Sequence, residues 1–144
     1  MWTNNYNGEQ YIPYVTIDLD PGIYVFSRDR ATGKTRLYKA LLDVKRYKDV
    51  VAYTYEDTFD NKDLSNSVKT AKVIMLDRYD LYRNKFTDII CKYSDKAIIL
   101  IDCKNTEDLD VGYDFCKIDM SIDRITVTKM WGLSDEYTRS YENE

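Results

Sequence analysis

Short apolar segments recur along the chain, and their patterns predict strands. Residues 14–19 alternate apolar and polar side chains before the turn signal Asp20-Pro21-Gly22, which predicts a hairpin-like strand at the start. Residues 118–128 alternate around Asp123 and Arg124, a pattern typical of either one bent strand or a short hairpin. Runs that are apolar or rich in β-branched and aromatic residues, as in strands buried on both faces, lie at 23–26, 50–55, 73–77 and 97–101.

Helical periodicity occurs between these runs. From Lys34 onward, apolar residues at helical spacing predict an amphipathic helix that ends near Lys48; they are Leu37, Ala40, Leu41, Val44 and Tyr47. A second helix within 84–92 is predicted from the offsets of Phe86, Ile89 and Ile90. Because buried strands alternate with helices, we expect a three-layer α/β domain whose mainly parallel sheet is covered on both faces.

Length and composition indicate one domain with one active surface. The 144 residues, 44% hydrophobic and 32% charged, suit a single globular domain spanning 1–144. The polar ends, 1–10 and 134–144, are expected to be flexible tails. A net charge of -4 makes nucleic acid an unlikely partner. The polar N-terminus does not resemble a signal peptide, and no apolar stretch reaches membrane-spanning length, so no membrane association is expected.

Residue types narrow the chemistry further. The chain has no histidine, which excludes His-based acid–base catalysis, triads with a His base and nearly every zinc site. Its three cysteines, Cys91, Cys103 and Cys116, are widely spaced among apolar or aromatic neighbours, which predicts buried thiols in a reducing, cytoplasmic compartment. Fourteen tyrosines with many Asn, Lys and Asp are typical of AT-rich coding, as in phages and mobile elements.

The segment from Arg28 to Thr35 is the most informative site. It follows a buried strand and opens an amphipathic helix, which is the context in which a Gly-Lys-Thr sequence binds phosphate. Backbone N–H groups and the helix N-terminus would face the phosphates, and Lys34 would neutralise their charge. The Thr35 hydroxyl would hold magnesium, and Gly33 would let the backbone approach closely. Arg28 and Arg30 would either clamp a phosphate or remain solvated loop charges.

These residues resemble the P-loop NTPase superfamily, in particular its additional-strand class, which includes AAA and ATP-binding-cassette domains. The resemblance implies a sheet ordered 5-1-4-3-2, preceded here by an antiparallel strand. It also implies a site for ATP and magnesium, with nucleotide contacts from Arg28, Arg30, Thr32, Gly33, Lys34, Thr35 and Asn105, and metal contacts from Thr35 and Asp77. The Walker A motif is degenerate, because Arg28 stands where the first glycine belongs, which would block or reshape the loop.

The residues at the ends of two predicted strands indicate whether the protein could hydrolyse ATP. Asp77 ends an apolar strand, as does the magnesium-side aspartate of that class, but Arg78 follows it where these ATPases usually carry a water-activating glutamate. Asp80 is expected to be solvated rather than catalytic. Asp102 and Asn105 lie after the fourth buried strand, where related ATPases place a polar γ-phosphate sensor; Asn105 would act as that sensor or only begin a turn. No catalytic residue is assigned.

Three functions agree with these features. The first is a small nucleotide-binding protein that prefers ATP over GTP and hydrolyses it weakly or not at all. The second is a degenerate P-loop protein that acts as a protein-interaction module, such as a phage or mobile-element inhibitor of a host defence machine; Arg28 and Arg78 favour it. The third, a minimal small-molecule kinase, ranks last because no acceptor-site signature or arginine cluster is evident.

Overall fold

The computed structural model describes residues 1–4, 13–26, 33–43, 49–54, 68–79, 83–103, 106, 109 and 111–130. In chain order the elements are β1 (Trp2–Thr3), β2 (Tyr14–Asp18), β3 (Gly22–Phe26), α1 (Lys34–Asp43), β4 (Val50–Tyr53), β5 (Val73–Leu76), α4 (Arg83–Tyr93), β6 (Ile98–Ile101), β7 (Asp114–Met120) and β8 (Arg124–Lys129).

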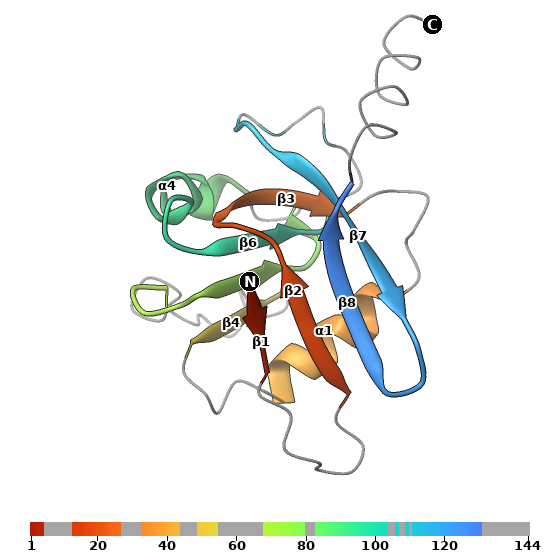
Figure 1. The fold of residues 1–144 in the computed structure, drawn as a ribbon. Helices are drawn as coiled ribbons and strands as arrows, with labels where there is room; N and C mark the ends of the chain where they lie inside the picture. Colours follow the sequence, from red (N-terminus) through yellow and green to blue (C-terminus); the bar gives the residue numbers. More distant parts are fainter. Residues whose placement is uncertain are drawn as a thin grey trace, which may run out of the picture.

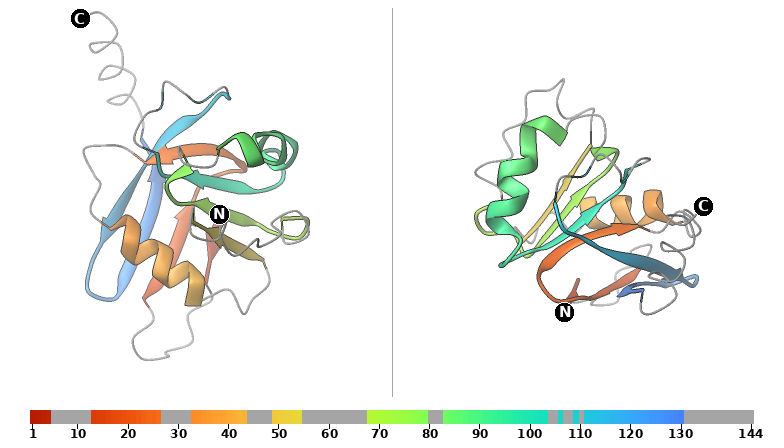
Figure 2. Two further views of the ribbon diagram at one scale, coloured as in Figure 1. Left: turned by 180° about the vertical axis from the view of Figure 1, so that it is seen from behind. Right: turned by 90° about the horizontal axis from the view of Figure 1, so that it is seen from above.

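All described strands belong to one eight-stranded mixed sheet, in the order β1-β2-β8-β7-β3-β6-β5-β4. The stretch from β7 through β3, β6 and β5 to β4 is parallel throughout. β7 and β8 form an antiparallel hairpin, β8 pairs in parallel with β2, and β1 closes that end by antiparallel pairing with β2. The sheet curls strongly along its length, so that β2 and β8 stand across from β5 and β4 (Figures 1 and 2).

Two hydrophobic clusters, one on each face of the sheet, explain why the central strands are apolar at every position. On β5, Val73 and Met75 join the cluster on the α1 face, and Ile74 and Leu76 join the cluster on the α4 face. The same alternation divides Ile98 to Ile101 on β6. Successive side chains of these strands point to opposite faces of the sheet, and each face meets a packed core. All positions of the strands are therefore apolar, as the sequence shows.

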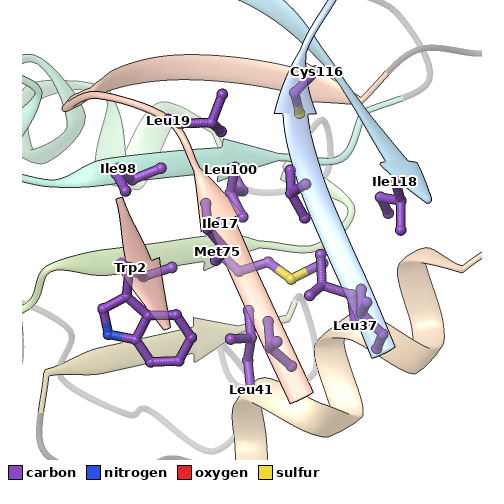
Figure 3. Close-up of a cluster of buried hydrophobic side chains, with 14 of the residues drawn as sticks. Trp2, Ile17, Leu19, Leu37, Leu41, Met75, Ile98, Leu100, Cys116 and Ile118 are labelled. Atoms are coloured by element: carbon purple, nitrogen blue, oxygen red, sulfur yellow. The ribbon is translucent and has the colours of Figure 1, made fainter. Parts of the chain in front are cut away.

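Helix α1 lies inside the curl of the sheet. Leu37 and Leu41, both fully buried, contact a cluster formed by strands from both arms, including Ile17 of β2 and Met75 of β5 (Figure 3). Full burial of each such side chain contributes about 1.5–3 kcal/mol to folding. Trp2 extends this cluster toward β4, and its indole Nε1 donates a hydrogen bond to Asp49 at 3.1 Å. The curl is therefore held by apolar contacts with a helix on its inner side.

The predicted fold class is wrong. A three-layer domain with a mainly parallel sheet and an antiparallel strand at its start was expected, whereas the structure has an eight-stranded mixed sheet curled into a half-barrel. Within this larger sheet, the four buried strands β3, β6, β5 and β4 do lie side by side in the expected order 1-4-3-2. In the described part of the chain the structure has only the helices α1 and α4. The physical reason lies in β1, β2 and β8, which extend the sheet beyond β7 and bend it around α1.

The predicted hairpin at Pro21-Gly22 is also wrong. β2 and β3 follow one another in sequence but are separated in the sheet by β8 and β7. Gly22 begins β3 and its N–H donates to the carbonyl of Ala97 at 3.1 Å, so the chain passes from one arm of the sheet to the other at this turn. For residues 118–128, the structure selects the hairpin from the two predicted alternatives.

The predicted positions of several elements are confirmed. β4, β5 and β6 lie within the predicted ranges 50–55, 73–77 and 97–101, and β3 begins one residue before the predicted range 23–26. α1 begins at Lys34 as predicted, and α4 extends one residue beyond the predicted range 84–92 at each end. α1 ends at Asp43 in the described residues, and the remainder of its predicted span, 44–48, lies outside them. Both predicted tails, apart from residues 1–4, also lie outside the described residues. No helix in the described part of the chain is long and apolar enough to cross a membrane.

Candidate functional site

The candidate site lies at the carboxyl ends of the adjacent parallel strands β3, β6 and β5, which we call the carboxyl edge. Asp77 and Asp102 directly follow β5 and β6. The Asp77 N–H donates to the Tyr53 carbonyl at 2.9 Å, and the Asp102 N–H donates to the Leu76 carbonyl at 2.9 Å. These bonds continue the strand ladders by one residue. They therefore fix the two acids side by side where ligands commonly bind in parallel sheets.

Lys34, the first residue of α1, reaches this edge and forms an ion pair. Its Nζ lies 2.7 Å from Oδ1 of Asp102, and the two side chains are only 16% and 15% exposed. The ammonium also lies 5.8 Å from the centroid of the Phe26 ring at the end of β3, within the range of a cation–π contact. A charge pair this shielded from water is stronger than one on the surface, so Lys34 has a defined position.

Asp77 completes a three-residue cluster with Lys34 and Asp102. The pKa of Asp77 is raised to about 6, mainly by burial and also by the side-chain hydrogen bond with Asp102 and the negative charge of Asp102. The positive charges of Arg78 and Lys34 act in the opposite direction. Below about pH 6 the protonated Asp77 donates to the Asp102 carboxylate. The cluster therefore combines one cation with two carboxyl groups that share a proton.

Arg78, immediately after Asp77, has a backbone φ of 52°, in the left-handed region that non-glycine residues rarely occupy. Such a conformation costs on the order of 1 kcal/mol or more and persists only where the surroundings enforce it. Here the next residue, Tyr79, donates its N–H to the Asp102 carbonyl at 2.8 Å. The turn after β5 is thus tied to the end of β6, and this holds Asp77 beside Asp102.

The start of α1 is held against the β7–β8 hairpin. Gly33 has a φ of 106°, and its carbonyl accepts the first helical bond from the Leu37 N–H at 2.8 Å. A Cβ on Gly33 would lie 2.9 Å from the Met120 sulfur, so only glycine fits without a shift. Arg36 Nη1 donates to the Ser121 carbonyl at 3.1 Å, and its Nη2 donates to the Ile122 carbonyl at 2.6 Å. The helix N-terminus and the hairpin tip therefore form one packed unit.

Cys116 on β7 is a neutral thiol near Lys34. It is fully buried, and burial raises the pKa of the thiol far above its ordinary value despite the opposing charge of Lys34. Cys103 is also buried, as predicted, but Cys91 is exposed, which corrects the prediction that all three thiols are buried. Cys91 lies on α4, and its apolar sequence neighbours belong to the inward face of that helix rather than to its own surroundings.

The structure brings together some of the predicted site residues. Lys34 and Asp77 lie in one cluster, Gly33 precedes them at the helix start, and Thr35 has an exposed side chain on α1. Arg28, Arg30, Thr32 and Asn105 lie outside the described residues, as does Asp80. Among the residues described, no group of three or more Cys, Asp or Glu side chains gathers to hold a metal ion.

The role of Asp102 as the ion-pair partner of Lys34 was not predicted from the sequence. Sequence reasoning placed this residue at the end of the fourth buried strand but assigned the sensing role to Asn105. The available signal was that Asp102, like Asp77, directly follows an apolar strand in the same sheet. Phe26 and Cys116 had no comparable signal, because their sequence patterns are those of ordinary core residues.

The chain matches no protein-family model, no curated protein sequence and no solved structure. The function of the protein is therefore inferred from the carboxyl edge itself.

Proposed function

We propose that the protein binds a nucleotide, ATP with magnesium, at the carboxyl edge and hydrolyses it weakly or not at all. The observation that carries this proposal is the position of Lys34. Its ammonium lies at the N-terminus of α1 and at the ends of parallel strands, close to two carboxyl groups. Helix N-termini and lysine side chains both bind phosphate groups. In open α/β sheets, ligands bind at the C-terminal ends of the parallel strands.

The oxygen-bearing side chains near Lys34 suit magnesium, which prefers oxygen ligands and keeps several of its waters. Asp77, whose carboxyl group is mostly ionised above about pH 6, would hold the ion, and Thr35, exposed at the start of the helix, would contribute its hydroxyl. Weak or absent hydrolysis is supported by Arg78, which directly follows Asp77 where the ATPases that this motif resembles carry a glutamate.

The test is isothermal titration of ATP with magnesium into the wild-type protein and Lys34→Met. We expect saturable binding that weakens about tenfold or more in Lys34→Met, since a charge-assisted hydrogen bond contributes about 1.5–3 kcal/mol. Lys39→Met is the matched control, because Lys39 is exposed on the same helix and should bind as the wild type does. A phosphate-release assay on the same samples should show little turnover. Absence of binding at millimolar ATP, or equal binding by Lys34→Met, would contradict the proposal.

A protein-interaction module, such as a phage or mobile-element inhibitor, is the second candidate. The observation that favours it is the tip of the β7–β8 hairpin, where Met120 is 42% and Ile122 is 95% exposed. Apolar side chains exposed together at one place on a surface are a feature of protein contact sites. Under this proposal, Ile122→Ser should abolish recovery of a partner captured by the wild-type protein and leave the ATP titration unchanged. Recovery of the same partner by Ile122→Ser would contradict it.

A further inference from the structure

We propose that Asp102 competes with phosphate for Lys34, so that the Lys34–Asp102 ion pair keeps the site closed until a ligand displaces it. This inference rests on the proposed nucleotide binding and adds a regulatory contact to it. The ammonium of Lys34 lies 2.7 Å from Asp102 Oδ1, with both side chains about 15% exposed. Oδ1 of Asp102 therefore occupies the place beside the ammonium that a phosphate oxygen would need.

Asp102 cannot follow Lys34 when the lysine moves. The backbone of Asp102 is bonded on both sides, since its N–H donates to the Leu76 carbonyl and its carbonyl accepts from the Tyr79 N–H. Lys34, in contrast, carries its ammonium at the end of a flexible side chain that starts from the first turn of α1, so the ammonium can move while the helix stays in place. The site therefore opens when the side chain of Lys34 moves away from Asp102, whose position is fixed.

Charge adds to this competition. In the ion pair, the negative charge of Asp102 already balances the positive charge of Lys34. An incoming anion thus meets a lysine whose charge is already balanced, and the affinity for the anion is reduced by the free energy of the ion pair that it breaks. The need to break a charge-assisted hydrogen bond of this kind lowers the affinity for the anion about tenfold or more.

Asp102→Asn tests the inference because asparagine keeps the size and hydrogen-bonding capacity of the side chain and removes its charge. Asp95→Asn is the matched control, since Asp95 is exposed in the turn before β6, at the opposite end of that strand. The first readout is the acylation rate of Lys34 by an amine-selective reagent, followed by mass spectrometry. It requires no nucleotide. The second is the affinity for ATP with magnesium by isothermal titration. Thermal unfolding of each variant confirms that it is folded, and Asp102→Ser replaces Asp102→Asn if that variant is not.

We expect Asp102→Asn to raise the acylation rate of Lys34 several-fold and to raise ATP affinity about tenfold, with Asp95→Asn equal to the wild type on both measures. An unchanged acylation rate would overturn the inference and leave the proposed function standing if ATP still binds. A faster acylation rate with unchanged ATP affinity would also overturn the inference, because the Lys34–Asp102 ion pair would then not compete with nucleotide binding. If neither the wild type nor Asp102→Asn binds millimolar ATP, the proposed function fails, and the inference that depends on it fails too.

Discussion

Gly33→Ala should destabilise the protein through two separate effects at the start of α1. The first is backbone strain, because Gly33 has a φ of 106°, where an L-residue costs about 1–3 kcal/mol. The second is a close contact, since the new Cβ would lie 2.9 Å from the Met120 sulfur and 3.1 Å from its Cε. The methionine end is flexible and can move, so this contact adds less than the strain. Together we expect a loss of about 2 kcal/mol.

Urea unfolding followed by circular dichroism measures this loss, and a thermal melt should show a decrease in Tm of roughly 4–8 °C. Repeating Gly33→Ala in a Met120→Ala background separates the two effects, because the contact with Met120 is then removed while the strain remains. The penalty should fall in that background but stay above about 1 kcal/mol, because the strain is the larger of the two effects. Gly112→Ala is the control, since nothing lies within 4 Å of its new Cβ, and it should stay within about 0.5 kcal/mol of wild type. A Gly33→Ala variant as stable as Gly112→Ala would refute the reasoning.

Two further predictions concern the core and the acid pair. Leu37→Ala removes a fully buried side chain between α1 and the curled sheet, and urea unfolding should show a loss of about 2–5 kcal/mol; a loss below 1 kcal/mol would mean that α1 does not hold the curl. The pKa of Asp77 is raised from 3.8 to about 6 in the folded protein, so its contribution to stability is present below about pH 4 and is lost as the pH rises through about 6. Asp77→Asn, which cannot titrate, should therefore gain stability relative to the wild type as the pH rises from 4 to 7, measured by urea unfolding at each pH; a constant difference would contradict the assignment.

The sequence predicted the local elements of the fold because their signals are local. Four-residue apolar runs identified β5 and β6, since both faces of these strands meet a core. Helical spacing after Lys34 identified α1. The curled sheet was not predictable in this way. β2 pairs with β8, and Tyr14 lies opposite Arg124, more than a hundred residues away, with no local feature that marks the pairing.

The wrong hairpin at Pro21-Gly22 shows the same limit. A turn signal indicates that the chain changes direction, but the partners of the strands on either side depend on packing far away in the sequence. For the candidate site, the sequence selected Lys34 and Asp77, which the structure places in one cluster. The ion pair between Lys34 and Asp102 was missed although the implied order placed the strands before these residues side by side, because the polar role after the fourth buried strand was assigned to Asn105.

The most direct test of the central claim, that Lys34 binds phosphate at the carboxyl edge, is a crystal structure with a non-hydrolysable ATP analogue and magnesium. The account predicts a phosphate oxygen at hydrogen-bonding distance from Lys34 Nζ, about 2.7–3.2 Å, beside the N-terminus of α1, with the lysine withdrawn from Asp102. A nucleotide bound elsewhere, or an empty edge with the Lys34–Asp102 ion pair intact at saturating analogue, would contradict it.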